Sequence, residues 1–146
     1  MMTDTAASTL TQEDLRIRDF QHWSLYLNPD QSYLGRVCLV ARRKDALDFL
    51  EMTRAERRGF FRAGRKVRRA LADLFQPDLF NYASLGNVYR HLHVHIVPRY
   101  RGARVFHQEE FCDPRWGQPY EGREAARTVG DETLLAIREA LRAILE

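Results

Sequence analysis

The sequence predicts an α+β domain with a mainly antiparallel sheet. Two observations support this prediction: apolar runs of strand length occur in pairs, and each pair is followed by a stretch with helical periodicity. The expected order is therefore strand, strand, helix, strand, strand, helix, which is typical of α+β folds. The chain has 146 residues, 45% of them hydrophobic, which is enough for one packed core.

The beginning of the chain is expected to lie outside this core. Residues 1–14 are mostly small or polar and predict a flexible tail, in which Thr11 and Asp14 are suited to begin a short helical turn. Residues 15–146 then form a single domain that ends in a helical extension.

The composition argues against several classes of protein. The first residues lack the basic and apolar segments of a signal peptide, and no apolar run approaches the ~20 residues of a membrane span. Cys38 and Cys112 form no disulfide framework or metal-type cluster, so we expect Cys38 to pack as a small hydrophobe and the protein to be cytoplasmic. The excess of basic over acidic residues, 23 against 20, is compatible with a phosphate-bearing ligand.

The first pair of apolar runs predicts a β-hairpin. Residues 20–27 alternate and are rich in aromatic side chains, and residues 36–41 are almost continuously apolar. The connection at 28–32 contains Asn, Pro, Asp and Ser, which are the usual residues of turns.

A long helix is expected next. Residues 46–50 are suited to one helical turn, and Thr53 with Glu56 three residues later is typical of a capping box. Apolar residues then recur three and four positions apart to about Phe75. The opposite face is basic, with Arg54, Arg57, Arg58, Arg62, Arg65, Lys66, Arg68 and Arg69. We expect this face to be solvated rather than to bind nucleic acid, because no aromatic residues interleave with the arginines.

The second half of the chain predicts two more strands and a helix. Residues 79–85 form the third strand, Gly86-Asn87 a turn, and residues 91–99 the fourth strand, which ends near Pro98. The stretch 100–120 is expected to be irregular, and residues 124–145 contain a closing helix.

The fourth strand carries three histidines, His91, His93 and His95, separated by aliphatic residues. Side chains alternate in a strand, so the three imidazoles are expected on one face. A purely structural role is disfavoured because charged imidazoles repel one another. A metal site is disfavoured because the first and third histidines lie about 13 Å apart at the backbone, and no further ligand has a supporting spacing. Covalent catalysis is favoured, in which a neutral imidazole attacks phosphorus and its neighbours bind phosphate and move protons.

The text HLHVHIV resembles the H-φ-H-φ-H-φ-φ signature of the histidine triad (HIT) family. The preceding NYASLGNV, the following PRY and the DPRWG at 113–117 are similar to the bacterial branch of that family related to diadenosine-polyphosphate hydrolases. The LNPDQSYLGRVCLV stretch resembles the family's ribose-binding hairpin. The resemblance covers residues 17–117 and implies a HIT-like fold with about five strands, a long helix and a C-terminal helix.

The resemblance also implies an activity. HIT proteins include nucleotide hydrolases and nucleotidyltransferases, which here would cleave a nucleoside-monophosphate linkage in a dinucleoside polyphosphate or a nucleoside phosphoramidate. His93 would be the nucleophile and would form a covalent nucleotidyl-histidine. His95 would act near the phosphate and leaving group, and His91 would support the arrangement. A backbone carbonyl that accepts the Nδ1 proton of His93 would leave Nε2 free to attack.

Three asparagines are expected to bind the nucleotide on the same grounds. Asn28 matches a position that contacts the ribose, Asn87 an amide near the phosphate, and Asn81 another such amide. Val88 stands where several relatives have a small hydroxyl residue, so the leaving-group preference stays open.

The implied partners are a purine nucleotide and a second copy of the chain, with no membrane and no nucleic acid. No metal or other cofactor is expected to be required, and the zinc-binding cysteines found at the start of some relatives are missing. Two alternatives remain: a phosphorylase, in which phosphate replaces water, and a nucleotide-binding regulatory module with little turnover. A third, nucleic-acid end processing with the basic helix, is ranked below them.

Overall fold

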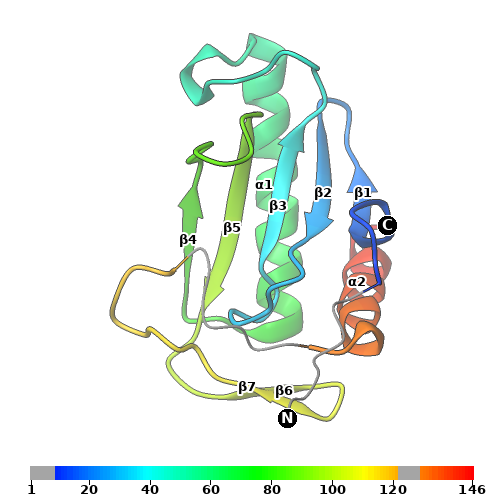
Figure 1. Cartoon of the computed structure of the whole chain (residues 1–146), viewed down its shortest axis with the longest axis vertical. Helices are drawn as coiled ribbons and strands as arrows, with labels where there is room; N and C mark the ends of the chain where they lie inside the picture. Colours follow the sequence, from blue (N-terminus) through cyan, green and yellow to red (C-terminus); the bar gives the residue numbers. More distant parts are fainter. Residues whose placement is uncertain (1–8, 122–128) are drawn as a thin grey trace.

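The computed structural model describes residues 9–121 and 129–146, and its centre is one antiparallel sheet (Figure 1). The spatial order of the five strands is β1-β2-β3-β5-β4, and every neighbouring pair is antiparallel. Their bounds are β1 (Arg16–Asp19), β2 (Trp23–Leu27), β3 (Val37–Ala41), β4 (Leu79–Ala83) and β5 (His93–Arg99). The predicted α+β class with about five antiparallel strands is confirmed.

The long helix α1 (Arg54–Phe75) runs along one face of this sheet (Figure 1). Its predicted capping box is present: the Thr53 hydroxyl accepts from the Glu56 amide at 3.0 Å, and the Glu56 carboxylate accepts from the Thr53 amide at 2.8 Å. The helix ends at Phe75, and the residue that caps it, Gln76, has a φ of +47° and precedes Pro77. The predicted bounds of this helix are therefore confirmed.

The two faces of the sheet differ because strand residues alternate. Leu25 on β2 pairs with Leu39 on β3, and Leu39 pairs with Val94 on β5. All three side chains are buried in the core under α1. The residues next to them, including Cys38 and His95, which also pair directly, point to the opposite face. Neither α1 nor α2 covers that face in Figure 1, which leaves room for a ligand there.

The turn before β3 is seated against α1. Gly35 has a φ of +86°, and a side chain at this position would come within 3.0 Å of Leu71 and 3.1 Å of Phe75. The turn is also tied internally, because the buried Gln31 side chain donates to the Asn28 and Arg36 carbonyls and accepts from the Gly35 amide. The predicted hairpin thus has a rigid connection, which fixes the start of β3.

The start of the domain differs from the prediction. Strand β1 was not predicted, because Arg16–Asp19 is short and three of its four residues are charged, as is common for an edge strand. The predicted tail includes residues 9–14, but Leu10 packs against the core. Thr11 and Asp14 exchange hydrogen bonds at the start of a 3-10 turn, Glu13–Leu15, as expected. The first eight residues of that tail lie outside the described residues.

Smaller differences occur later in the chain. The helical turn expected at 46–50 is a 3-10 turn at Phe49–Glu51, and β4 ends two residues before the predicted boundary. The stretch expected to be irregular contains a two-stranded ribbon, β6 (Arg104–Phe106) and β7 (Glu109–Phe111). The closing helix α2 spans Asp131–Leu145 and contacts β1 and α1. The part of its predicted range at 124–128 is not among the described residues. None of the described helices is both long and apolar enough to cross a membrane.

Candidate active site

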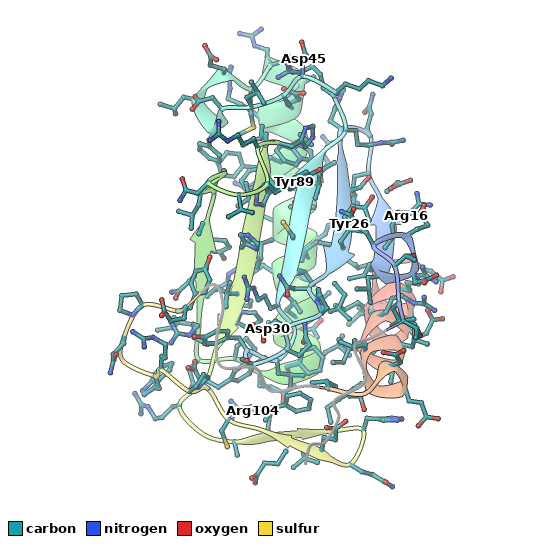
Figure 2. All side chains as sticks on the ribbon, in the orientation of Figure 1. Arg16, Tyr26, Asp30, Asp45, Tyr89 and Arg104 are labelled. Atoms are coloured by element: carbon teal, nitrogen blue, oxygen red, sulfur yellow. The ribbon has the colours of Figure 1, made fainter. Side chains whose placement is uncertain are left out.

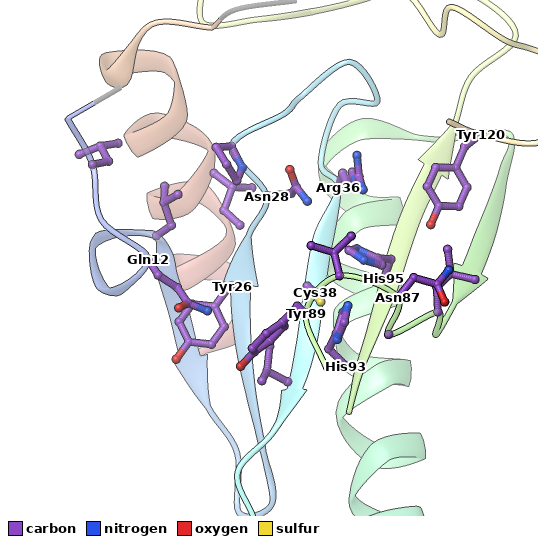
Figure 3. A pocket seen from close by; sticks show the side chains of 18 residues that line it. Gln12, Tyr26, Asn28, Arg36, Cys38, Asn87, Tyr89, His93, His95 and Tyr120 are labelled. Carbon is purple, nitrogen blue, oxygen red and sulfur yellow. The ribbon is translucent and has the colours of Figure 1, made fainter. Parts of the chain in front are cut away.

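A cavity of about 720 Å³ lies over the sheet face that α1 leaves open (Figure 3). Strands β2, β3 and β5 form its floor, and the segment 85–89 between β4 and β5 contributes to its wall. Tyr26 and Tyr89, labelled in Figure 2, both line this cavity, as does Tyr120. Two of the three triad histidines, His93 and His95, are in the lining.

The backbone fixes the orientation of the His93 ring. Its Nδ1 lies 2.6 Å from the carbonyl oxygen of His91, and a carbonyl only accepts, so Nδ1 carries the proton and donates. The lone pair of the neutral imidazole is therefore on Nε2, as the sequence analysis expected of a nucleophile. Only 8% of His93 is exposed, and the Tyr89 ring lies 5.2 Å from it, centroid to centroid.

His95 lies edge-on to His93, with the ring centroids 5.0 Å apart and the planes at 85°. Its Nδ1 is buried and has no hydrogen-bond partner among the described residues. Burial, the positive charge of Arg36 and the neighbouring His93 together lower the pKa of His95 from 6.5 to about 4. His95 is therefore neutral at pH 7.

His91 lies just before the strand that was predicted to begin with it. Strand β5 begins at His93, because β3 ends at Ala41 and β4 ends opposite His95, so His91 lies beyond both ladders. Its Nε2 lies 2.6 Å from the Ala41 carbonyl and donates to it. His91 is not in the cavity lining, and it anchors the segment whose carbonyl holds His93.

Two of the three predicted asparagines reach the cavity. Asn28 leaves the end of β2, its side-chain oxygen accepts from the Asp30 amide at 2.8 Å, and its amide nitrogen stays available to a ligand. Asn87 is exposed on the segment before β5. Figure 3 shows Asn28 and Asn87 on either side of His95, so a ligand that spans the histidines can contact both.

Asn81 is not brought to this cavity. It lies on β4, and its side-chain oxygen accepts from the Arg99 guanidinium at 2.6 Å. Arg99 also forms a buried ion pair with Asp113 at 2.8 Å, and this carboxylate accepts from the Tyr100 amide. The PRY and DPRWG segments are thus joined to β4 through one polar network, and Asn81 belongs to it.

Arg36 is a charged residue of the cavity lining that was not predicted from the sequence. Only 3% of it is exposed, its guanidinium lies 3.7 Å from the Asp30 carboxylate, and it lies over the Tyr120 ring at 5.4 Å. The alternation of side chains that was applied to the histidines could have found it. Arg36, Cys38 and Val40 are two residues apart in turn, so they share the sheet face that lines the cavity. A buried guanidinium at the cavity suits an anionic ligand such as phosphate.

Cys38 was predicted to pack as a small hydrophobe and to belong to no metal-type cluster, and the structure differs on both points. It is free, it lines the cavity, and it lies directly opposite His95. One ligand atom from each of Cys38, His93 and His95 falls within 4.8 Å of the others, and within residues 9–121 and 129–146 this is the one His, Cys or acidic group of three that could hold a metal ion. Burial raises the pKa of the Cys38 thiol to about 12, so without a metal the sulfur is protonated.

Comparisons with known proteins agree on the fold. A family model described as the HIT domain matches residues 15–102. A histidine triad protein from Bradyrhizobium japonicum is 26% identical, with a TM-score of 0.77, over 97% of this chain and 100% of that chain. A histidine triad protein from Sinorhizobium meliloti 1021 is 22% identical, with a TM-score of 0.75, over 93% and 96%.

A more distant similarity is to the diadenosine triphosphate hydrolase of Plasmodium falciparum, solved with cyclomarin A. It is 12% identical, with a TM-score of 0.63, over 91% of this chain and 77% of that chain, and so it shows the fold alone. No curated protein sequence matches this chain.

Proposed function

This chain belongs to the HIT domain family, and from that premise we propose that it cleaves a nucleoside-monophosphate linkage through a covalent nucleotidyl-histidine on His93. Family membership supports a nucleotide-binding, hydrolase-type function in general. The hydrogen bond from His93 Nδ1 to the His91 carbonyl carries the specific proposal. Because Nδ1 holds the proton, the lone pair of the ring is on Nε2, and His93 lines the cavity. The placement in the bacterial branch of the family stays a prediction.

In the first step, Nε2 of His93 attacks the α-phosphorus while the bond from phosphorus to the leaving group breaks. The imidazole becomes positively charged as it attacks, and the hydrogen bond from Nδ1 to the carbonyl stabilises that charge. In the second step, water attacks the same phosphorus, the P–N bond breaks, and a nucleoside monophosphate is released. His95, whose ring lies 5.0 Å from that of His93, is the neighbouring group placed to take the proton from this water.

The cavity supplies groups for each part of the nucleotide. Arg36 provides positive charge for the phosphate, Asn87 an amide beside it, and Asn28 an amide for the ribose hydroxyls. Tyr26 and Tyr89 offer aromatic surface to a purine base. None of these roles requires a metal ion, so we propose that no cofactor is needed for turnover.

We further propose a homodimer. Strand β4 is an open edge of the sheet, and it and the segment after it expose Leu79, Tyr82 and Leu85 by 45%, 53% and 65%. An edge strand with exposed apolar side chains is suited to pair with a second copy. The cytoplasmic location also stays a prediction. It rests on the two cysteines, Cys38 and Cys112, which are both free.

A trapped adduct tests the nucleophile directly. Protein mixed with diadenosine tetraphosphate is quenched without acid, since P–N bonds are acid-labile, and its intact mass is measured. We expect the wild type to gain one adenylate, the His93→Ala variant to gain none, and the His107→Asn variant, altered at an exposed histidine outside the cavity, to behave as wild type. An adduct that persists in His93→Ala contradicts the assignment.

Product analysis separates the remaining alternatives. AMP release from diadenosine tetraphosphate and from adenosine phosphoramidate indicates a hydrolase. Release of ADP from the phosphoramidate only when phosphate is added indicates a phosphorylase. Nucleotide binding without any product indicates a regulatory module, and this result would contradict the proposed activity.

A further inference from the structure

The floor of the cavity brings together three side chains that commonly bind metal ions. Cys38 on β3 pairs directly with His95 on β5, and His93 lies two residues earlier on the same face of β5. The three ligand atoms fall within 4.8 Å of one another. Two neighbouring strands of the sheet therefore hold the group in place, rather than a loop.

Each imidazole has a nitrogen available for coordination. Nδ1 of His93 is occupied by the His91 carbonyl, so Nε2 is the donor atom of that ring. Nδ1 of His95 is buried without a hydrogen-bond partner in the described chain, and a bound ion is one way to satisfy such an atom. Cys38 takes part in no disulfide.

The ligand set selects the kind of ion. Two imidazoles and a thiolate suit Zn²⁺ and similar ions, whereas Mg²⁺ and Ca²⁺ prefer oxygen ligands, which this group lacks. In a tetrahedral zinc site the ligand atoms are about 3.3–3.6 Å apart, given Zn–N and Zn–S bonds of about 2.0 and 2.3 Å. Side-chain rotations that bring the ligand atoms closer by at most about 1.5 Å close the site. All three residues line the cavity, so the fourth position is open to it.

We propose that Cys38, His93 and His95 form a binding site for Zn²⁺ and that the bound ion inhibits the enzyme. Coordination forms a metal–sulfur bond, the thiol proton passes to solvent, and no atom changes its oxidation state. The inhibitory half rests on the proposed function: His93 cannot attack phosphorus while its Nε2 lone pair is bound to a metal. The site is thus a reversible block on the nucleophile, not a cofactor site.

Cobalt provides a readout that does not depend on activity. Co²⁺ added to metal-free protein should give a near-ultraviolet thiolate-to-metal band that saturates at one ion per chain. We expect the same band in the Cys112→Ser variant, which changes the exposed cysteine outside the cavity, and none in Cys38→Val. A Cys38→Ala variant, with circular dichroism on both, covers the case that Cys38→Val misfolds. No band in the wild type, or a band in both Cys38 variants, overturns the site.

Inhibition is measured on AMP release, each protein relative to its own metal-free rate. Zn²⁺ should inhibit the wild type at a concentration at least tenfold lower than it does Cys38→Val, and a chelator should restore the wild-type rate. Equal sensitivity of the two proteins overturns the inhibitory role. A wild type that shows the cobalt band but releases no nucleotide contradicts the proposed function and leaves the metal site standing, so the two failures are distinguishable.

Discussion

The two faces of the central sheet are built from the same strands but have different environments. The face toward α1 carries Leu25, Leu39 and Val94, which are buried among other apolar side chains. The open face carries Cys38 and the two histidines at positions where the same strands alternate outward. The first face stabilises the fold by burial, whereas the second holds polar groups that the fold leaves available for chemistry. Adjacent residues of one strand therefore serve different purposes: one stabilises the core, and the next faces the cavity.

The strongest test of this separation is the His93→Ala variant. If the open face serves chemistry, AMP release should fall at least about 1,000-fold, as expected for loss of a nucleophile. Nucleotide affinity should stay within about tenfold, and the free energy of unfolding should fall by about 1–3 kcal/mol, because the His91 carbonyl loses its donor. Steady-state kinetics and urea unfolding measure both effects. Full activity would show that the two faces do not differ in this way.

The converse test uses two adjacent residues of β3. Leu39→Ala removes a fully buried side chain under α1 and should cost about 2–5 kcal/mol of unfolding free energy. Val40→Ala, on the open face and only partly buried, should cost less than about 1.5 kcal/mol. Urea unfolding of the two variants compares the faces one position apart. Equal losses would contradict the distinction.

A third variant tests the boundary between the faces. His91→Asn removes the imidazole that donates to the Ala41 carbonyl, but it keeps the backbone carbonyl that holds His93. We expect AMP release to fall about tenfold, since the segment loses an anchor but Nε2 stays free. A loss as large as that of His93→Ala would mean that the His91 side chain itself takes part in the chemistry.

The smallest expected effect is the pH dependence of stability that comes from Glu56 on α1, the helix that packs on the buried face of the sheet. The hydrogen bond from Arg43 holds the pKa of Glu56 below its usual value of 4.5, against the opposing effect of burial. A carboxylate with a lowered pKa stabilises the fold above pH 4.5, and this contribution is lost as the pH falls through the folded-state pKa.

The free energy of unfolding of the wild type should therefore exceed that of Glu56→Gln by about 1 kcal/mol at pH 7, a usual value for a charged pair in which one partner, here Arg43, is partly exposed. The difference should shrink toward pH 3, as measured by urea unfolding at each pH. A constant difference across this range would show that the charge contributes nothing.

Local patterns predicted much of this molecule. The capping box and the spacing of apolar residues predicted α1, and alternation predicted β2, β3 and the face that His93 shares with His95. Strand β1 was not predicted because Arg16–Asp19 lacks an apolar run and becomes a strand only by pairing with β2.

The remaining misses at the site depend on contacts distant in the chain. His91 leaves the strand because β3 ends at Ala41, fifty residues earlier. Asn81 is drawn into the network of Arg99, eighteen residues later. Cys38 meets His95 because of the pairing register between β3 and β5, which no local pattern contains.

The acceptor that orients His93 is a main-chain carbonyl, and this has a genetic consequence. No missense change at codon 91 can delete that oxygen, because every amino acid supplies it. A mutational scan of position 91 would therefore report only on the side chain, and it would not detect the carbonyl that sets the tautomer of His93. Selection on that oxygen should instead act on the codons that shape the path of the backbone before β5, whereas selection on the His91 side chain acts through its hydrogen bond to the Ala41 carbonyl.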